Sequence, residues 1–145
     1  FNWLAPTLPG ARCMDLYAGT GVLGIEALSR GASQTVFVDK SASVTRQLIA
    51  TLHGLDAVGT EVITADAVDY LDREPAPFDI VFLDPPYGTV LDNLCTLLGQ
   101  GWLAPRAQVY LEWNRKQEPP EMPEDWTLSR NKTAGQVRYA LAERG

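Results

Sequence analysis

The chain contains 145 residues, with 12 Lys and Arg against 18 Asp and Glu, which gives a formal net charge of −6 at pH 7. This length suits one domain, and an apolar content of 46% can build a core, which excludes disorder as the dominant state. No apolar run approaches the roughly 20 residues of a membrane span, and two cysteines are too few for a disulfide framework. Because no charged and apolar leader opens the sequence, we expect a cytoplasmic monomer with neither a metal site nor a membrane partner.

Strand-like and helix-like segments alternate along the chain. Apolar runs typical of strands occupy 13–17, 35–38, 61–64, 78–83 and 109–113. Helical patterns follow the first four of these runs, at 22–30, from a cap at Ser41 to Leu52, at 67–71 and at about 89–98. Residues 117–125, rich in Pro and Glu, predict a surface loop. Two final strands, around 127–130 and 137–141 and joined through 133–135, predict a hairpin.

This order of segments predicts the fold. Five strands connected by four helices and followed by a hairpin indicate an α/β, Rossmann-like, doubly wound sheet of seven strands, mostly parallel with a C-terminal antiparallel hairpin. We expect residues 1–145 to form a single domain. Ligands of such sheets bind beyond the C-terminal ends of the strands, so the residues that directly follow each strand are the candidates for a site.

The first of these candidates is a glycine-rich segment. Gly19, Gly21 and Gly24 satisfy G-x-G-x-x-G between a strand and a helix, and Asp39 ends the second strand, where an acid can bind ribose hydroxyls. A nicotinamide or flavin dinucleotide and S-adenosylmethionine both fit this loop, as does a tight turn that binds nothing. Asp15 favours S-adenosylmethionine, because a carboxylate near the loop repels a pyrophosphate and attracts an ammonium or a sulfonium group.

The third predicted strand is followed by Asp66 and Ala67. The Asp66 carboxylate is placed to accept a hydrogen bond from an adenine amino group. The same carboxylate can cap the N-terminus of the helix that follows, and the two roles are compatible.

The fourth predicted strand is followed by Asp84-Pro85-Pro86-Tyr87. Two prolines stiffen the backbone and remove two N–H donors, so the carbonyls that remain can only accept. The Asp84 carboxylate and the Pro85 carbonyl can then both accept from one exocyclic amine, which turns its lone pair toward an electrophile and stabilises the developing positive charge. Tyr87 offers a flat face on which a nucleobase can stack. The alternative is a plain turn that ends the strand.

These segments resemble a known family. The sequence Asp15-Leu16-Tyr17-Ala18-Gly19-Thr20-Gly21 resembles motif I of class I S-adenosylmethionine-dependent methyltransferases, and 84–87 resembles their (D/N)PP(Y/F) motif for nucleobase amines. Over essentially its whole length, the chain is similar to the RsmD family, which methylates N2 of a guanine in small-subunit ribosomal RNA. The supporting segments are 1–4, 24–32, 101–103 and 134–137. The four-residue motif by itself does not separate guanine from adenine or cytosine.

The resemblance implies S-adenosyl-L-methionine as the cofactor and 16S ribosomal RNA, free or in the assembling small subunit, as the partner. It implies that the cofactor-binding residues are Asp15, Tyr17, Ala18, Gly19, Thr20, Gly21, Asp39, Lys40, Asp66 and Ala67. It implies that the catalytic residues are Asp84, Pro85, Pro86 and Tyr87. Family members usually carry a further N-terminal segment, rich in Arg and Lys, that contacts RNA. The chain opens on apolar residues without Met, so we expect an N-terminal piece to be missing.

The charged residues of the C-terminal part suggest where an anionic partner binds. Between Trp126 and Ala142 the sequence contains the charged residues Arg130, Lys132 and Arg138 and no acidic ones. We expect these three side chains to contact RNA phosphates. The alternative is a solvated hairpin face.

Other functions remain open on the sequence alone. The glycine pattern also fits a nicotinamide-dependent oxidoreductase, which Asp15 and the Asp84-Pro85-Pro86-Tyr87 turn disfavour. A non-catalytic RNA- or protein-binding module that has kept the fold is the second alternative. Within the methyltransferases, N6 of adenine and N4 of cytosine are alternatives to N2 of guanine.

Overall fold

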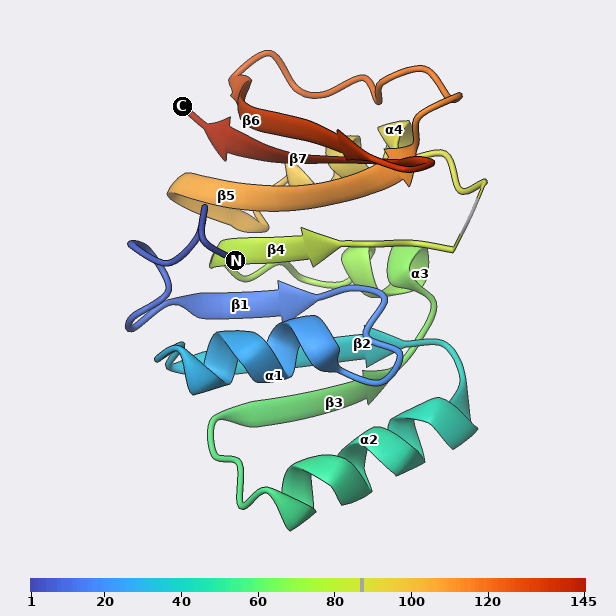
Figure 1. Ribbon diagram of the computed structural model, residues 1–145. Helices are drawn as coiled ribbons and strands as arrows, with labels where there is room; N and C mark the ends of the chain where they lie inside the picture. The colour runs from blue at the N-terminus through green and yellow to red at the C-terminus, as the bar shows by residue number, and fades with distance from the viewer. Residues whose placement is uncertain (87) are drawn as a thin grey trace.

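The computed structural model describes residues 1–86 and 88–145, so Tyr87 lies outside the described residues. Strands and helices alternate as predicted from β1 to β5, and a hairpin follows (Figure 1). The strands are β1 (Arg12–Asp15), β2 (Gln34–Asp39), β3 (Thr60–Thr64), β4 (Phe78–Leu83), β5 (Leu103–Asn114), β6 (Trp126–Ala134) and β7 (Val137–Arg144). The helices are α1 (Val22–Ser29), α2 (Ala42–Gly54), α3 (Ala67–Leu71) and α4 (Asp92–Leu98).

All seven strands form one sheet in the order β3-β2-β1-β4-β5-β7-β6. The first five strands are mutually parallel, whereas β7 pairs antiparallel with both β5 and β6. The predicted mostly parallel sheet with a C-terminal antiparallel hairpin is confirmed. The order of the strands reverses between β1 and β4, and the ligand site of a doubly wound sheet forms at such a reversal.

Several boundaries differ from the prediction, since β6 and β7 are longer than predicted, and two of the differences have a local reason. β5 begins at Leu103, well before the predicted 109, because its pairing with β4 shifts register between Phe78 and Ile80 and so accommodates Pro105. α4 begins at Asp92 and not near Thr89, because the N–H and hydroxyl of Thr89 both donate to the Pro86 carbonyl and form a separate turn.

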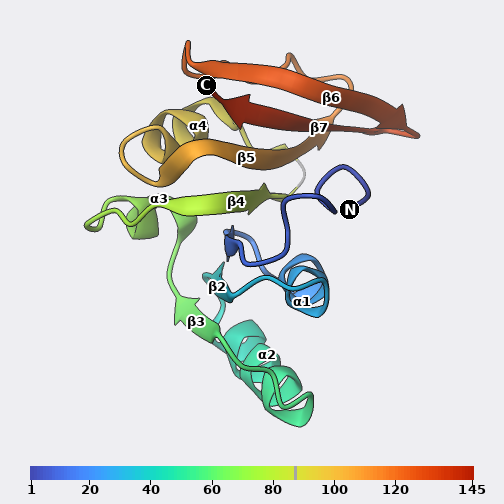
Figure 2. The ribbon, with the colours of Figure 1, turned by 90° about the vertical axis from the view of Figure 1, so that its left-hand side faces the viewer.

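Helices cover both faces of the sheet, α1 and α2 on one and α3 and α4 on the other (Figure 2). Leu48 and Leu52 of α2 pack on Phe37 of β2, while Tyr70, Leu94 and other side chains of α3 and α4 pack on the opposite face. Apolar residues line both faces of the central strands, which is why their sequences are continuously hydrophobic. The core therefore fixes the positions of the strand ends that carry the polar residues.

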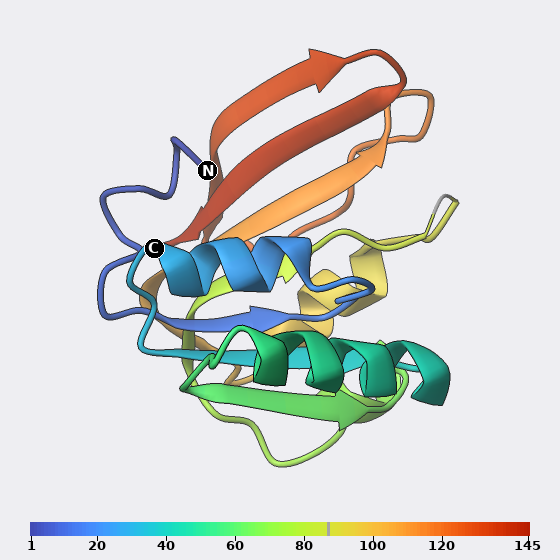
Figure 3. The same cartoon turned by 60° about the horizontal axis from the view of Figure 1, so that its bottom comes forward.

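The N-terminal segment lies beside β7 and covers the part of the sheet that α1 leaves open (Figure 3). Leu4 and Leu8 are buried there, and the Trp3 ring packs on Tyr139 with 5.6 Å between ring centres. No helix of the described residues is long and apolar enough to cross a membrane.

Candidate active site

The loop after β1 is a tight turn, and two of its glycines are required for different structural reasons. Gly19 has φ +54° and its N–H donates to Asp39 Oδ2 at 3.1 Å, which ties the loop to the end of β2. A Cβ at Gly24 would collide with the buried Phe37 ring, so this third glycine lets α1 pack closely on the sheet. The glycine pattern thus has structural reasons in addition to any ligand.

Asp15 lies beneath this loop and does not line the cleft above it. The residue is 1% exposed, and its Oδ2 accepts from the Gly24 N–H at 3.2 Å. Its Oδ1 has no hydrogen-bond partner among the described residues. Burial raises the pKa of Asp15 to about 7, the Gly24 hydrogen bond opposes this, and the charges of Asp84 and Asp39 add to it. Asp15 therefore titrates near neutrality.

Asp39 and Asp66 both hold backbone N–H groups at the edge of the sheet. The Asp39 oxygens accept from Gly19 and from Ser41, the latter at 3.0 Å, and each oxygen keeps a lone pair for another donor. Asp66 caps α3, since its Oδ1 accepts from the N–H groups of Val68 at 2.9 Å and Asp69 at 3.4 Å. The predicted cap at Asp66 is confirmed, and its Oδ2 receives no hydrogen bond from the described part of the chain.

A cleft of about 560 Å³ opens between these carboxylates at the C-terminal edge of β1, β2 and β4. It brings together nine of the predicted site residues, namely Tyr17, Gly19, Asp39, Lys40, Asp66, Ala67, Asp84, Pro85 and Pro86, and adds Leu16, Ala65 and Thr89. Ala18, Thr20 and Gly21, like Asp15, do not line it. The N–H of Ala18 instead extends the sheet by donating to the Val38 carbonyl at 3.0 Å. Burial, followed by the Asp66 charge, raises the pKa of Tyr17.

The turn after β4 forms the wall of this cleft nearest to Asp15. The N–H and hydroxyl of Thr89 donate to the Pro86 carbonyl at 3.1 and 2.7 Å, whereas no described residue donates to the Pro85 carbonyl. The Asp84 side chain is solvent-exposed, yet enough protein surrounds it that partial burial, together with the charge of Glu112, raises its pKa to about 6. Asp84 and the Pro85 carbonyl are thus two acceptors that receive no hydrogen bond from residues 1–86 and 88–145. The predicted role of Tyr87 lies outside the described residues.

A second cavity, of about 260 Å³, lies on the other side of the same turn. Asp84, Pro85, Pro86 and Thr89 line both cavities, so the turn is a shared wall. The residues that complete the second cavity are Gly88, Glu112, Trp113, Asn114, Gln117, Gln136 and Val137. Gly88 comes from the segment between β4 and α4, and the others come from the end of β5, the loop after it and the turn between β6 and β7.

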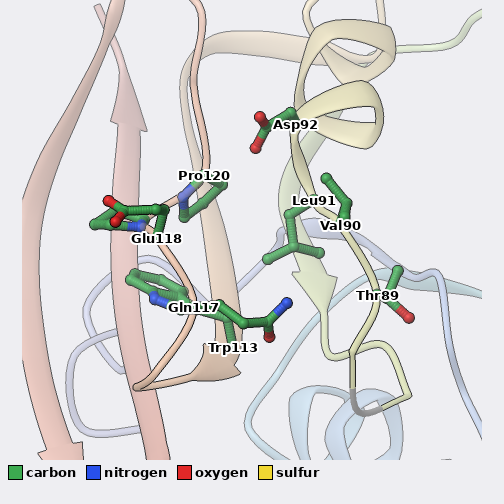
Figure 4. Close-up of a pocket in the computed structure, with 9 residues that line it drawn as sticks. Thr89, Val90, Leu91, Asp92, Trp113, Gln117, Glu118 and Pro120 are labelled. Atoms are coloured by element: carbon green, nitrogen blue, oxygen red, sulfur yellow. The ribbon is translucent and has the colours of Figure 1, made fainter.

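A smaller hollow of about 160 Å³ continues from the second cavity between α4 and the loop after β5 (Figure 4). Thr89, Trp113 and Gln117 line both. Leu91, Pro119 and Pro120 give the hollow apolar walls, and Asp92 and Glu118 give it acidic ones. Its lining contains no Lys or Arg among the described residues, so it does not suit a phosphate.

Glu112 is the functional candidate that the sequence prediction missed. It lies near the end of β5 in the second cavity, and its Oε2 accepts from the Tyr110 hydroxyl at 2.9 Å. The sequence contains a signal for it, because an acid interrupts the apolar run Val109–Trp113 at the edge where ligands bind. Gln136 and Val137 had no such signal.

The structure does not bring the three predicted basic residues together. Lys132 pairs with Tyr139 and Arg130 with Leu141, whereas Arg138 pairs with Thr133. Because side chains alternate along a strand, Lys132 and Arg130 lie on one face of the hairpin and Arg138 on the other. The Arg138 guanidinium donates to Asn131 at 2.6 Å. Lys132 lines a separate cavity of about 370 Å³ with Arg30, Trp3 and other residues.

Comparison with known proteins gives the relatives of the chain. Residues 1–143 match the family described as Conserved hypothetical protein 95. The chain is 40% identical to the ribosomal RNA small subunit methyltransferase D of Escherichia coli (strain K12) over 146 residues, 99% of the chain and 74% of the relative. It is also 40% identical to the methyltransferase D of Haemophilus influenzae over 147 residues, 97% of the chain and 76% of the relative.

A solved structure of the Escherichia coli protein yhhF superposes with a TM-score of 0.96 at 40% identity, covering 99% of the chain and 82% of the other. The sequence match and the superposition extend over the glycine loop, the turn after β4 and the hairpin. By both criteria, the chain belongs to the conserved hypothetical protein 95 family, that of the ribosomal RNA small subunit methyltransferases D.

Proposed function

We propose that the chain transfers a methyl group from S-adenosylmethionine to the N2 amine of a guanine in small-subunit ribosomal RNA. Methylation of ribosomal RNA is the activity that its relatives are named for, and the guanine N2 amine is the finer part of the proposal. The observation that carries it is the turn at Asp84, Pro85 and Pro86, which is the common wall of two cavities. A methyl donor in one cavity and the base to be methylated in the other would meet at this wall.

The larger cleft fits a cofactor that carries hydroxyls and positive charge. Asp39, Asp66 and Asp84 line it, Asp15 lies beneath it with an oxygen that has no internal partner, and Lys40 is the one cation on its described lining. Such a site repels a pyrophosphate and attracts an ammonium and a sulfonium. Asp39 would hold the ribose hydroxyls and Asp66 the adenine amine. The acids therefore favour S-adenosylmethionine over a nicotinamide dinucleotide.

The chemistry requires acceptors and alignment more than acid or base strength. Bound S-adenosylmethionine would supply an electrophilic methyl group. The N2 lone pair would form the new bond to this group, and the electron pair of its former bond would remain on sulfur. Asp84 and the Pro85 carbonyl accept from the amine hydrogens, which aligns the N2 lone pair and stabilises the charge that develops there. N2 then loses one proton, and Asp84 is placed to take it because its pKa is raised to about 6.

The RNA strand next to the target base would bind in a cavity lined by cations, which is a neighbour of the second cavity. Lys132 and Arg30 line the cavity beside the N-terminal segment together with the aromatic rings of Trp3 and Tyr139. Cations beside partly exposed rings suit a single-stranded nucleotide next to the target base. Tyr110 lines this cavity and donates to Glu112 of the second one, so the two cavities are neighbours.

The test is methylation of defined RNA by the purified full-length protein. Small-subunit ribosomal RNA, free and assembled with its proteins, is incubated with S-adenosylmethionine that carries an isotope-labelled methyl group, and its nucleosides are analysed by mass spectrometry. We expect one labelled N2-methylguanosine, whose position is then mapped. Label on adenine N6 or cytosine N4 would overturn the guanine assignment, and no label on either substrate would overturn the proposed function.

A further inference from the structure

The second cavity contains two carboxylates, and the chemistry of methyl transfer uses one of them. Asp84 belongs to the turn after β4, and Glu112 belongs to β5, the neighbouring parallel strand. The two are close enough for the charge of Glu112 to raise the pKa of Asp84. Placing a second acid beside the reacting acid costs electrostatic energy. A ligand group that donates a hydrogen bond to Glu112 would offset this cost.

Glu112 is held in place by an aromatic side chain. The Tyr110 hydroxyl donates to its Oε2 at 2.9 Å, and the Tyr110 ring packs against Phe82 with 6.3 Å between ring centres. Burial, followed by the hydrogen bond to Glu112, raises the pKa of Tyr110, so its hydroxyl remains a donor at every physiological pH. One carboxylate oxygen is therefore fixed, and no donor to the other occurs within residues 1–86 and 88–145.

No cation of the protein neutralises this acid within the described part of the chain. The ion pairs among the described residues join Arg30 to Glu26 and Arg144 to Asp125, so neither involves Glu112, and the cavity lining includes no Lys or Arg. An oriented carboxylate without a cation, in a cavity that opens on solvent, is an acceptor for a ligand N–H group.

We infer that Glu112 accepts a hydrogen bond from the N1–H of the target guanine while Asp84 accepts from its N2 amine. This inference rests on the proposed function and adds the residue that selects the base. Guanine carries an N–H at N1 beside the exocyclic amine, so two neighbouring acceptors match its edge. Adenine and cytosine carry a ring nitrogen lone pair beside their amines, and this lone pair would face the Glu112 carboxylate. The cavity thus rejects them by repulsion as well as accepting guanine.

The test uses a guanine analogue that has a lone pair instead of a hydrogen at N1 and keeps the reacting amine. Small-subunit ribosomal RNA is prepared by ligation with guanine or 2-aminopurine at the mapped target, and both are tested free and assembled with ribosomal proteins. 2-Aminopurine keeps the 2-amine but lacks O6 and has a lone pair at N1, so the change of the ratio on Glu112→Gln, and not the ratio alone, reports on N1. For the unmodified protein, we expect kcat/KM for guanine to exceed that for 2-aminopurine by about 10- to 100-fold. For Glu112→Gln, whose amide can donate to that lone pair, we expect the ratio to fall to about 1 or to reverse.

Three further variants test whether the change in base preference is due to Glu112 itself. Glu143→Gln removes the same charge from an exposed position of β7 outside the cavities, and its ratio should equal that of the unmodified protein. Glu112→Asp keeps the negative charge and should keep the preference for guanine at a lower rate, which provides a result even if Glu112→Gln unfolds. Tyr110→Phe should reduce the preference without abolishing it.

The outcomes separate this inference from the function on which it rests. If the unmodified protein labels guanine N2 but does not prefer guanine to 2-aminopurine, or if Glu112→Gln keeps the original ratio, Glu112 does not select the base and the proposed function stands. If Glu112→Gln unfolds and Glu112→Asp loses the preference, the inference also fails. If the unmodified protein labels no guanine N2, both fail.

Discussion

Replacing Asp15 with Asn should change how the stability of the protein depends on pH. Asp15 is 1% exposed and its pKa is raised by burial from an ordinary 3.8 to about 7. The folded protein therefore binds this proton more tightly than the unfolded chain does. A raised pKa contributes stability that is fully present below the unfolded value and is lost as the pH rises through the folded value. Ionisation of Asp15 thus destabilises the fold between about pH 4 and pH 7.

The size of the effect follows from the two pKa values. Each pKa unit corresponds to about 1.4 kcal/mol, and most of the shift of Asp15 is crossed between pH 5 and pH 8. The free energy of unfolding should fall by about 2–3 kcal/mol over this range through Asp15 alone. Asn cannot ionise but can still accept from the Gly24 N–H, so Asp15→Asn should lose this part of the pH dependence.

Urea unfolding at pH 5, 6, 7 and 8 measures the difference. The free energy of unfolding of Asp15→Asn minus that of the unmodified protein should increase by about 2–3 kcal/mol from pH 5 to pH 8. Subtraction cancels most other titrating groups, and Glu74→Gln, at an exposed loop position, is the matched control for the loss of a carboxylate. A pH-independent difference for Asp15→Asn would refute the assignment of a raised pKa to Asp15.

Further predictions concern the cleft and its support. Asp39→Ala should weaken S-adenosylmethionine binding by about 1–3 kcal/mol in calorimetry, through lost hydrogen bonds to the ribose and to the Gly19 turn; unchanged affinity would remove Asp39 from the site. Asp84→Ala should slow single-turnover methyl transfer by about 10²–10³ with pre-bound RNA, and a near-normal rate would disprove the mechanism. In the unmodified protein this rate should rise with pH around 6 as Asp84 ionises, and a flat profile would contradict its pKa. Gly24→Ala should lower the free energy of unfolding by about 1–3 kcal/mol, because its Cβ meets the Phe37 ring; an unchanged urea midpoint would mean that the ring moves aside.

Local sequence patterns predicted those parts of the molecule that depend on near neighbours in the chain. The bounds of β4 and α3 agree with the prediction, and so do the caps at Ser41 and Asp66, because apolar runs and capping side chains act within a few residues. The glycine loop was predicted for the same reason. The beginning of β5 was not, since it depends on a register shift against β4 that no local pattern indicates.

Contacts between distant segments were the part that the sequence did not predict. Asp15 was expected to face the ligand, but it lies beneath the loop, because the alternation of β1 and the closeness of α1 turn it toward Gly24. The basic residues of the hairpin were expected to act together, whereas the pairing of Lys132 with Tyr139 and of Arg138 with Thr133 places them on opposite faces. Both outcomes depend on which face of a strand a residue occupies, which the register decides.

The antiparallel hairpin explains why this sheet has a second cavity beside its cofactor cleft. A parallel strand next to β5 would begin at the far edge of the sheet, whereas β7 begins at Val137, beside the C-terminal end of β5 (Figure 1). The β6–β7 turn consequently stands at the same edge of the sheet as the loops after β1 and β4, and Gln136 and Val137 line the second cavity together with Asp84. The reversal of strand order between β1 and β4 creates one cavity and the reversal of strand direction at β7 creates the other. Asp84, in the turn after β4 and so between these two reversals, is the acid that lines both cavities.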